Sequence, residues 1–410
     1  MKFDTVIIGG GLSGLTAGIS IAKSGKSVAV ISAGRSTLHF NSGSFDLIGY
    51  DKTGKEVLYP KESLADMEES HPYSKIDNVL ELAEEARQLL LDAGIRVKGD
   101  AAKNHYRITP MGVAKPTWLT LDDFFTSDSA EHLPFERVLL VNIAGFLDFP
   151  VDFISEGLER LGCKVYVKSV SVPALKDERI SPSKMRSAGI ARLLASPETV
   201  DAIAAKINLS VGDSEVVLLP AILGLKDDNM IVALRDKLQK PMYTIATLPP
   251  SVPGMRVQTA LCRRFEKLGG TFLLGGTVTG GEWQDNRVVG INCSSLPEET
   301  IVAKNYILAT GSFQSHGIVA DFRRVYEPIF DLDVDYEEKR EAWTARDVFD
   351  SQPYMSFGVR TDSQFRVFKD SKVISNVYAV GSVLSGHDSV KRADAAGVSM
   401  LTALAVSKKI

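Results

Sequence analysis

A glycine-rich turn near the start of the chain constrains the fold more than any other feature. Residues 5–8 (TVII) form a short β-branched apolar run, which predicts a buried parallel strand. Residues 9–14 follow at once with the spacing GxGxxG, and residues 12–24 carry helix formers. Residues 27–31 (SVAVI) predict a second strand. This order of strand, turn, helix and strand is typical of a nucleotide-binding βαβ unit.

The glycines of this turn have separate physical roles. Gly9 lets the chain turn tightly, Gly11 leaves the backbone open to a phosphate, and Gly14 lets the helix pack close to the strand. The helix that begins near Leu12 directs free N–H groups and its dipole towards an anion. We therefore expect the cofactor to be bound by Gly9, Gly11, Leu12, Ser13 and Gly14.

The end of the second strand lacks the acidic residue that normally holds an adenosine ribose. Ser32 occupies this position, Arg35 and Ser36 follow, and no carboxylate occurs between residues 5 and 45. A hydroxyl binds a ribose more weakly than an ionised acceptor does, whereas Arg35 can contact a phosphate. We therefore expect FMN, whose single phosphate fits the helix, with FAD as the alternative.

Two later segments also resemble turns that face a cofactor. Residues 255–308 predict a helix, a strand, a hairpin and a strand that ends in Ala-Thr-Gly-Ser at 309–312. Residues 376–382 (NVYAVGS) resemble the strand end of flavoproteins, with serine in place of the usual aspartate, and a final helix is expected at 392–407. The polar segment 36–47 is either a further cofactor contact or an exposed loop that leads into a hairpin. These segments add Ser42, Gly43, Thr310, Gly311, Gly381, Ser382 and Gly397 to the expected cofactor-binding residues.

Together these pieces predict an α/β fold. We expect a glutathione-reductase-type Rossmann flavoprotein domain assembled from residues 1–50, 250–320 and 371–410. Residues 51–249 and 321–370 are expected to be α+β insertions that form a substrate or cap domain and face partners. Within the insertions, the apolar spacing predicts helices at 76–93 and 153–161, a helical stretch at 179–208 and strands at 137–143 and 163–167. Residues 196–198 (SPE) predict a new N-cap within that stretch, with proline as the first helical residue.

Composition disfavours several other classes of function. The 410 residues include 47 basic and 51 acidic side chains, so the chain has no broad basic surface for nucleic acid or an anionic membrane. No apolar run approaches the roughly 18 residues of a spanning helix. The three cysteines, Cys163, Cys262 and Cys293, lie far apart without CxxC spacing, which excludes an iron–sulfur or structural zinc site within the chain. We expect a cytoplasmic protein without a signal peptide or a metal.

Seven segments give the whole chain a more specific resemblance. They are residues 3–15 (FDTVIIGGGLSGL), 38–47 (LHFNSGSFDL), 219–225 (LPAILGL), 247–256 (TLPPSVPGMR), 309–320 (ATGSFQSHGIVA), 327–334 (EPIFDLDV) and 377–388 (VYAVGSVLSGHD). With these segments the chain resembles the B-subunit family of the anaerobic glycerol-3-phosphate dehydrogenase over residues 1–410. One departure is residues 392–397 (RADAAG), which carry fewer glycines than the family pattern has.

The resemblance implies a role within a larger complex. In that family, the B-subunit is an FMN flavoprotein that pairs with a larger, catalytic subunit that bears FAD. A third, iron–sulfur subunit connects the pair to the membrane and to quinone. The complex oxidises sn-glycerol 3-phosphate to dihydroxyacetone phosphate and feeds anaerobic respiration with fumarate or nitrate. Contact of this chain with the inner face of the cell membrane is accordingly expected to be indirect, through the partner subunits.

The implied reaction needs a base for the hydroxyl proton and cations for the phosphate. His39, His316 and His387 are the candidate bases, because they are the histidines within the family-like segments. The candidate phosphate ligands are Arg256, Arg323, Arg324 and Arg392. Two interpretations stay open: the chain oxidises the substrate itself, or it is a non-catalytic electron relay or scaffold. A third interpretation is that the chain is a stand-alone FAD- or NAD-dependent oxidoreductase.

Overall fold

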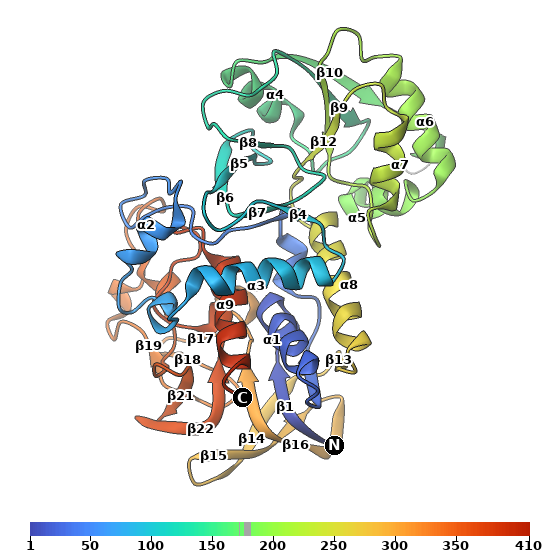
Figure 1. Ribbon diagram of the computed structural model, residues 1–410. Coiled ribbons are helices and arrows are strands. Elements are labelled where there is room, and N and C mark those ends of the chain that lie inside the picture. The colour runs from blue at the N-terminus through green and yellow to red at the C-terminus, as the bar shows by residue number, and fades with distance from the viewer. Residues whose placement is uncertain (172, 176–181) are drawn as a thin grey trace.

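The chain forms two lobes, which the computed structural model in Figure 1 shows one above the other. The structure describes residues 1–171, 173–175 and 182–410. Both termini lie in the lower lobe, and the upper lobe is built from the middle of the chain. Each lobe has its own apolar core, and the core of the upper lobe draws its buried residues from Ile108 to Ile245.

The lower lobe is built on a sheet whose central strands are parallel. Their order is β13-β2-β1-β16, and β22 joins on the far side of β16. The first residues of β16 pair instead with an antiparallel hairpin of β14 and β15, and β21 pairs antiparallel with β22. The strands are β1 (Lys2–Ile8), β2 (Val28–Ser32), β13 (Thr271–Leu274), β14 (Val278–Gln284), β15 (Arg287–Cys293), β16 (Leu296–Leu308), β21 (Arg366–Lys369) and β22 (Lys372–Ala379).

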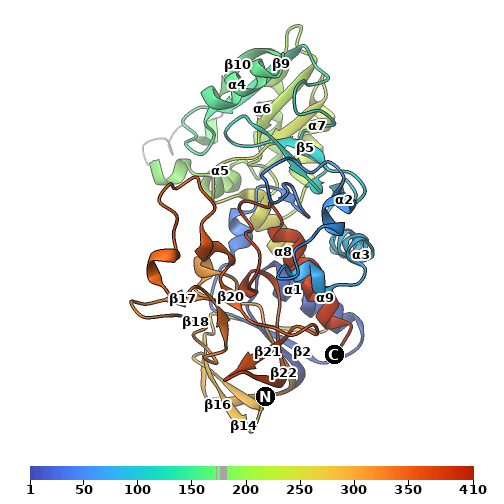
Figure 2. The ribbon, with the colours of Figure 1, turned by 90° about the vertical axis from the view of Figure 1, so that its left-hand side faces the viewer.

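Four helices cover this sheet. They are α1 (Leu12–Lys23), α3 (Val79–Asp92), α8 (Val252–Lys267) and α9 (Ala395–Ser407). Helix α9 packs between α1 and α3, and its residues from Ala396 to Val406 are all buried, which explains why its sequence is apolar all round. Figure 2 shows α1, α9 and α3 side by side and the segment with β17 and β18 along one side of the lobe.

The upper lobe is a second α/β unit. Its sheet has the order β10-β9-β11-β12, and all of its neighbouring strands run parallel. The strands are β9 (Arg137–Ile143), β10 (Lys164–Val170), β11 (Val216–Pro220) and β12 (Met242–Ile245), and the helices are α4 (Val151–Arg160), α5 (Ser187–Leu193), α6 (Pro197–Asn208) and α7 (Asn229–Lys237). Parallel strands need such helical crossovers, because after each strand the chain must return to the end of the sheet at which the next strand begins.

Short elements connect the two lobes and lie along the border of the lower lobe. The short strands are β3 (Ser44–Phe45), β4 (Val97–Lys98), β5 (His105–Ile108), β6 (Ala114–Thr117), β7 (Leu119–Leu121), β8 (Thr126–Ser127), β17 (Val319–Ala320), β18 (Val325–Tyr326), β19 (Val334–Asp335) and β20 (Gly358–Val359). The remaining α-helix in this part of the chain is α2 (Pro60–Ala65). None of the helices in the described part of the chain is long and apolar enough to cross a membrane.

The predicted α/β fold and most of its elements are confirmed. Strand β9 has the predicted bounds, and within 255–308 the predicted strand is β13 and the predicted hairpin is β14 and β15. The predicted helical stretch 179–208 contains two helices, α5 and α6. The predicted N-cap between them is confirmed, because Ser196 accepts a hydrogen bond from the N–H of Thr199 and Pro197 is the first residue of α6. Residues 179–181 of this prediction lie outside the described residues.

The lobes are joined by a buried ion pair. Arg256 on α8 donates to the Asp123 carboxylate at 2.9 Å and to the carbonyl oxygens of Leu223 and Gly224. Arg256, one of the candidate phosphate ligands, is therefore engaged in this contact between the lobes. The domain boundaries expected from the sequence stay a prediction. The packing of α3 against α9 favours a shorter insertion, since α3 belongs to the core of the lower lobe.

Candidate flavin site

The turn between β1 and α1 is held by close backbone contacts that only glycine permits. Gly9 has a φ of 120°, and a Cβ there would lie 2.1 Å from the carbonyl oxygen of Ala309. A Cβ on Gly14 would lie 1.9 Å from the carbonyl oxygen of Gly9. These two glycines therefore bring the turn onto the end of β16 and the helix onto the turn, as the spacing predicts.

Gly11 has a different environment. It caps α1 with an ordinary φ of −83°, and the nearest atom to a Cβ built there is Ser36 Cβ at 3.8 Å. The first turn of α1 has no side-chain cap and no acidic residue, so its N–H groups and the positive end of its dipole stay available. This end of α1 is the kind of site that binds a phosphate.

A cavity of about 630 Å³ opens at this position. It lies over the carboxyl ends of β1, β2 and β16, where open α/β sheets bind their ligands. Its lining comes from residues 8–13, 31–37, 276–279 and 309–311, with Ser315, His316, Val319, Pro328, Ile329, Ser382 and Ser399. The cavity is within the size range of cofactor sites.

Most of the predicted cofactor residues meet at this cavity. Those that line it are Gly9, Gly11, Leu12, Ser13, Ser32, Arg35, Ser36, Thr310, Gly311 and Ser382, and the candidate base His316 joins them. Gly14 lies just behind the turn. These residues come from three segments far apart in the sequence, and the sheet brings the segments together because β1 pairs with both β2 and β16.

Polar atoms in the cavity fit a flavin nucleotide. The buried hydroxyl of Thr310 has no hydrogen-bond partner within the described part of the chain, so it is free to bond a ligand. Ser32 donates its hydroxyl proton to the carbonyl oxygen of Gly34 at 2.9 Å, which leaves its lone pairs to accept from a ribose hydroxyl. Arg35 is exposed at the mouth of the cavity. The uncapped N-terminus of α1 and the free space beside Gly11 can accommodate a phosphate, and the hydroxyl groups of Ser32 and Thr310 can bond a sugar attached to it.

Three predicted glycines have packing roles and lie outside the cavity lining. A Cβ on Gly43 would lie 2.4 Å from the ring of Phe124, and a Cβ on Gly397 would lie 2.0 Å from the hydroxyl of Tyr73. Gly381, with a φ of 75°, lies against Ser13. The half-buried Ser42 next to Gly43 does not line the cavity either. Gly397 near the start of α9 is thus covered by Tyr73, whereas Ser399 on the same helix lines the cavity.

The three candidate bases are separated. His316, in the left-handed conformation with a φ of 59°, lines the cavity. His39 is half-buried outside it, where burial and the charge of Arg35 lower its pKa more than its bond to Gln258 raises it. His387 is buried beside α9 and contacts Asp394.

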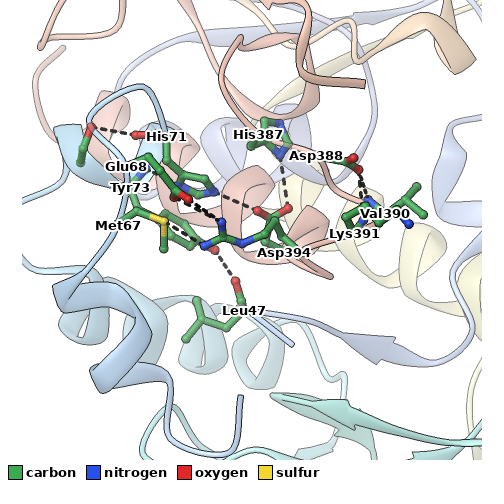
Figure 3. A network of polar contacts seen from close by, with 12 residues as sticks. Leu47, Met67, Glu68, His71, Tyr73, His387, Asp388, Val390, Lys391 and Asp394 are labelled. Atoms are coloured by element: carbon green, nitrogen blue, oxygen red, sulfur yellow. Dashed lines mark hydrogen bonds and ion pairs between the residues drawn. The ribbon is translucent and has the colours of Figure 1, made fainter. Parts of the chain in front are cut away.

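The contacts of His387 reveal two residues that the sequence did not single out. Asp394, directly before α9, lies between His387 and His71, and Figure 3 shows both imidazoles directed at its carboxylate. His71 and Asp394 are 323 positions apart, so no local motif joins them. A signal was present in the isolated Asp394 of an otherwise apolar helix start, but it does not identify the partners.

The cysteines and acidic residues that the structure describes do not gather into a metal centre. Cys163, Cys262 and Cys293 are free thiols, and burial raises the pKa of Cys262 to about 11. Within residues 1–171, 173–175 and 182–410, no group of three or more histidine, cysteine or acidic side chains is placed to hold a metal ion.

The fold and the cavity define an α/β flavoprotein with a Rossmann-type cofactor site, and a comparison with known families agrees. A family model described as an FAD binding domain matches residues 4–398. This match supports a flavin cofactor, and FAD rather than FMN, so the expectation of FMN is not supported.

Full-length relatives identify the family. The anaerobic glycerol-3-phosphate dehydrogenase B-subunit from Yersinia pseudotuberculosis is 40% identical over 416 residues, which cover 100% of this chain and 98% of the relative. The corresponding protein from Pectobacterium atrosepticum is 37% identical over 415 residues, with 100% and 99% covered. The chain belongs to the anaerobic glycerol-3-phosphate dehydrogenase B-subunit family.

Solved structures show weaker similarity. The Escherichia coli quinol fumarate reductase protein FrdA aligns over 100% of this chain and 70% of its own, with 10% identity and a TM-score of 0.46. A 3-ketosteroid Δ1-dehydrogenase from Sterolibacterium denitrificans aligns over 100% and 99%, with 10% identity and a TM-score of 0.44.

Proposed function

We propose that this chain binds FAD in the cavity at the start of α1 and oxidises sn-glycerol 3-phosphate to dihydroxyacetone phosphate within its complex. The observation that carries the proposal is the cavity itself, which joins an open Gly11, an uncapped helix end and an unpartnered hydroxyl of Thr310. The substrate follows from the relatives, which are named as the B-subunit of an anaerobic glycerol-3-phosphate dehydrogenase.

The length of the cavity favours FAD over FMN. Besides the turn at Gly11 and the end of β2 at Ser32, the lining includes residues 276–279, so the cavity reaches more of the chain than the turn that a single phosphate would occupy. An adenosine needs room on this side, whereas FMN has no group to place there. Serine in place of the usual acid supplies an acceptor without a charge, so we propose a dinucleotide whose ribose is held by a neutral contact.

The residues of the chain supply binding and orientation. The N–H groups at the start of α1 hold the phosphates, Ser32 accepts from a ribose hydroxyl, and Thr310 bonds a further polar group of the cofactor. A bound flavin would supply the two-electron oxidant, because the redox chemistry belongs to the cofactor and the protein contributes binding and orientation. A base of the chain is needed to take the hydroxyl proton of the substrate.

We further propose that the chain acts together with partner subunits. The relatives are named as one subunit of a dehydrogenase, which implies other subunits of a complex. By the family resemblance these are the larger subunit that bears FAD, together with the iron–sulfur subunit that delivers electrons to quinone at the cytoplasmic side of the membrane. This chain would lie in the cytoplasm and meet the membrane only through them.

A non-catalytic relay is the second candidate function. It is favoured by the fact that His316 alone of the three candidate bases lines the cofactor cavity. In this case the chain holds its flavin and passes on electrons that the larger FAD-bearing subunit takes from the substrate.

Two measurements on the full-length protein test these proposals. Acid release of the cofactor followed by chromatography should yield about one FAD per chain, and FMN or no flavin would overturn the cofactor assignment. The purified chain is then given sn-glycerol 3-phosphate and an artificial acceptor. Turnover by the chain alone supports catalysis here, whereas turnover that appears only when the larger FAD-bearing subunit is added supports the relay.

A further inference from the structure

A loop of the lower lobe, residues 345–352, presents apolar side chains to solvent. Val348 and Phe349 near its middle have 77% and 83% of their surface exposed. Exposed apolar residues are ordinary when they occur singly, whereas a contiguous group of them marks an interaction site. The loop also belongs to the segment 321–370, which the sequence predicts to face partners.

The loop is held in shape by its own hydrogen bonds. The side-chain oxygen of Gln352 accepts from the backbone N–H of Ala345 at 3.0 Å. The side-chain nitrogen of Gln352 donates to the carbonyl oxygens of Asp347 and Asp350. The Asp347 carboxylate accepts from the backbone N–H of Phe349 at 2.9 Å. The backbone that carries Phe349 is therefore fixed, although its ring lies outside the core.

The two ends of the loop are anchored in the lobe. The backbone N–H of Tyr354 donates to the carbonyl oxygen of Trp343 at 3.0 Å. The ring of Trp343 is buried and makes edge contacts with the rings of Tyr336 and Phe357. The apolar residues of this segment are thus divided between a packed base and an exposed middle. The exposed side chains contribute little to the stability of the lobe, because apolar surface stabilises the fold only where it is removed from water.

The loop that precedes α9 adds a third apolar side chain. Val390 on this loop is 65% exposed, and the ammonium group of the adjacent Lys391 donates to the carbonyl oxygen of Phe349. The Asp388 carboxylate accepts from the backbone N–H groups of Val390 and Lys391, which fixes this loop as well (Figure 3). We call Val348, Phe349 and Val390 the apolar tip, since they come from two loops that contact each other.

A groove with a volume of about 450 Å³ borders the apolar tip. Both loops contribute to its wall, the first through Ser351 and the second through Lys391. The remaining wall comes from residues 51–54, Glu68, residues 70–71, residues 386–388 and Arg392. A groove beside an exposed aromatic ring can receive a side chain of a binding partner, as protein interfaces commonly place an anchor next to a pocket.

The unpaired charge in the wall of this groove is positive. Asp51 and Asp388 accept from backbone N–H groups of their own loops. Glu68 accepts from Arg392 Nη1 at 2.9 Å. Lys52 is exposed, and no bond of its ammonium group is found among the described residues. The groove therefore offers a cation to a carboxylate from another chain, and complementary charge of this kind favours a specific partner.

We propose that the apolar tip and the groove beside it are the surface by which this chain docks on another subunit of its complex. The partner presents an apolar pocket to Phe349 and a carboxylate to Lys52. The relatives are named as one subunit of a dehydrogenase, which makes a different chain the expected occupant. A loop that is already fixed loses little conformational entropy on docking, so its aromatic ring contributes most of its burial to affinity. The proposal rests on the proposed assembly with partner subunits.

The first test removes the exposed ring. The full-length chain is titrated with the purified other subunits of the complex, and assembly is followed by analytical ultracentrifugation. Phe349→Ala should raise the Kd about 30-fold or more, the change that corresponds to about 2 kcal/mol for an interface hot spot. Because this ring is 83% exposed, thermal unfolding and flavin content of the free chain should match the wild type. Phe153→Ala on α4 of the upper lobe, where the ring is 52% exposed, is the matched control and should assemble as the wild type.

The second test reverses the charge at the groove. Lys52→Glu should raise the Kd about 10-fold or more at low salt, because it sets like charges opposite each other. The difference from the wild type should shrink as the salt concentration rises, since ions screen an exposed pair. Lys55→Glu, at an exposed position three residues away that does not line the groove, is the control. An equal Kd for Lys52→Glu and the wild type at low salt would overturn the charge contact.

Hydrogen exchange locates the contact without a variant. In the assembled complex, the backbone amides of residues 345–352 and 386–392 should exchange more slowly than in the free chain. The amides of α4 in the upper lobe should exchange equally in both samples.

The outcomes separate this surface from the proposed assembly. Unchanged exchange in both loops, or a Kd for Phe349→Ala equal to that of the wild type, would overturn the surface and leave the assembly intact. A free chain that dimerises through Phe349 would assign the surface to a second copy and overturn the proposal. A wild-type chain that stays alone in the presence of the other subunits would overturn the proposed assembly together with the surface.

Discussion

A methyl group added at Gly11 should separate cofactor binding from folding. The position has a φ of −83°, which alanine adopts without strain, and the nearest atom to the new Cβ is Ser36 Cβ at 3.8 Å. The new Cβ therefore projects into the cavity, where the proposed phosphate lies against the backbone. Gly11→Ala should leave the stability of the cofactor-free protein within about 1 kcal/mol. Alanine lowers the conformational entropy of the unfolded chain, which favours the folded state. Alanine is also a poorer N-cap residue than glycine, which disfavours the folded state, so the two effects oppose each other.

The same methyl group should weaken FAD binding. An extra carbon in a fitted site costs about 1–3 kcal/mol, which corresponds to roughly a 5- to 150-fold rise in Kd. The measurement is a titration of the cofactor-free protein with FAD, followed by flavin fluorescence, together with urea unfolding of the same sample.

Gly14→Ala is the matched control for this experiment. Its Cβ would lie 1.9 Å from the carbonyl oxygen of Gly9, a backbone atom that cannot move without shifting α1. This variant should lose about 1–3 kcal/mol of stability before any ligand is added. An unchanged Kd for FAD in Gly11→Ala, with Gly14→Ala destabilised, would show that the cofactor does not lie against Gly11 and would refute the reasoning.

Three further variants test burial in the lower lobe and at its junction with the upper lobe. Burial raises the pKa of Glu327 from its ordinary value of 4.5 to about 7. The folded state therefore binds more protons than the unfolded chain between these pH values, and its stability should fall by about 3 kcal/mol as the pH rises through this window. Glu327→Gln should remove this dependence in urea unfolding, and parallel pH profiles would contradict it. Asp123→Ala leaves Arg256 buried without its carboxylate and should cost about 3–5 kcal/mol. Asp122→Ala, at a partly exposed position, should cost less than about 1 kcal/mol, and equal losses would refute the role of the buried pair. Gly397→Ala should cost about 1–3 kcal/mol in the cofactor-free protein, because its Cβ meets the hydroxyl of Tyr73, and unchanged thermal unfolding would return Gly397 to the cofactor site.

The glycine turn of the cofactor site could be predicted from the sequence because much of what it requires is local. Gly14 approaches the carbonyl oxygen of Gly9 within the turn itself, whereas the neighbour of Gly9 is Ala309, which directly follows β16. The pairing of β1 with β2 and β16 then follows from the order of the elements. The same reasoning fails for Gly43 and Gly397, because the side chains that exclude a Cβ there, Phe124 and Tyr73, are remote in sequence. A glycine pattern indicates positions where a side chain would not fit. It does not show whether a ligand or an aromatic ring of the protein lies next to the glycine.

The acid–base group near α9 could not be predicted, for a related reason. His387 is an ordinary loop histidine by sequence, and it gains an orientation only through Asp394, which is fixed from its other side by His71 and the backbone of Tyr73. These contacts depend on the fold of residues 71–73 over the start of α9. The sequence alone therefore does not show that His71, His387 and Asp394 form one group.

The expectation of FMN shows how the absence of one side chain can be overinterpreted. An acid missing at Ser32 does not mean that an adenosine is missing. Residues 276–279, at the start of β14, also line the cavity. Room for an adenosine and charge to hold it are separate properties, and the serine at position 32 bears only on the second. A flavin held in this way should be bound less tightly at its adenosine end than at α1, because the helix N-terminus supplies the stronger electrostatic contact.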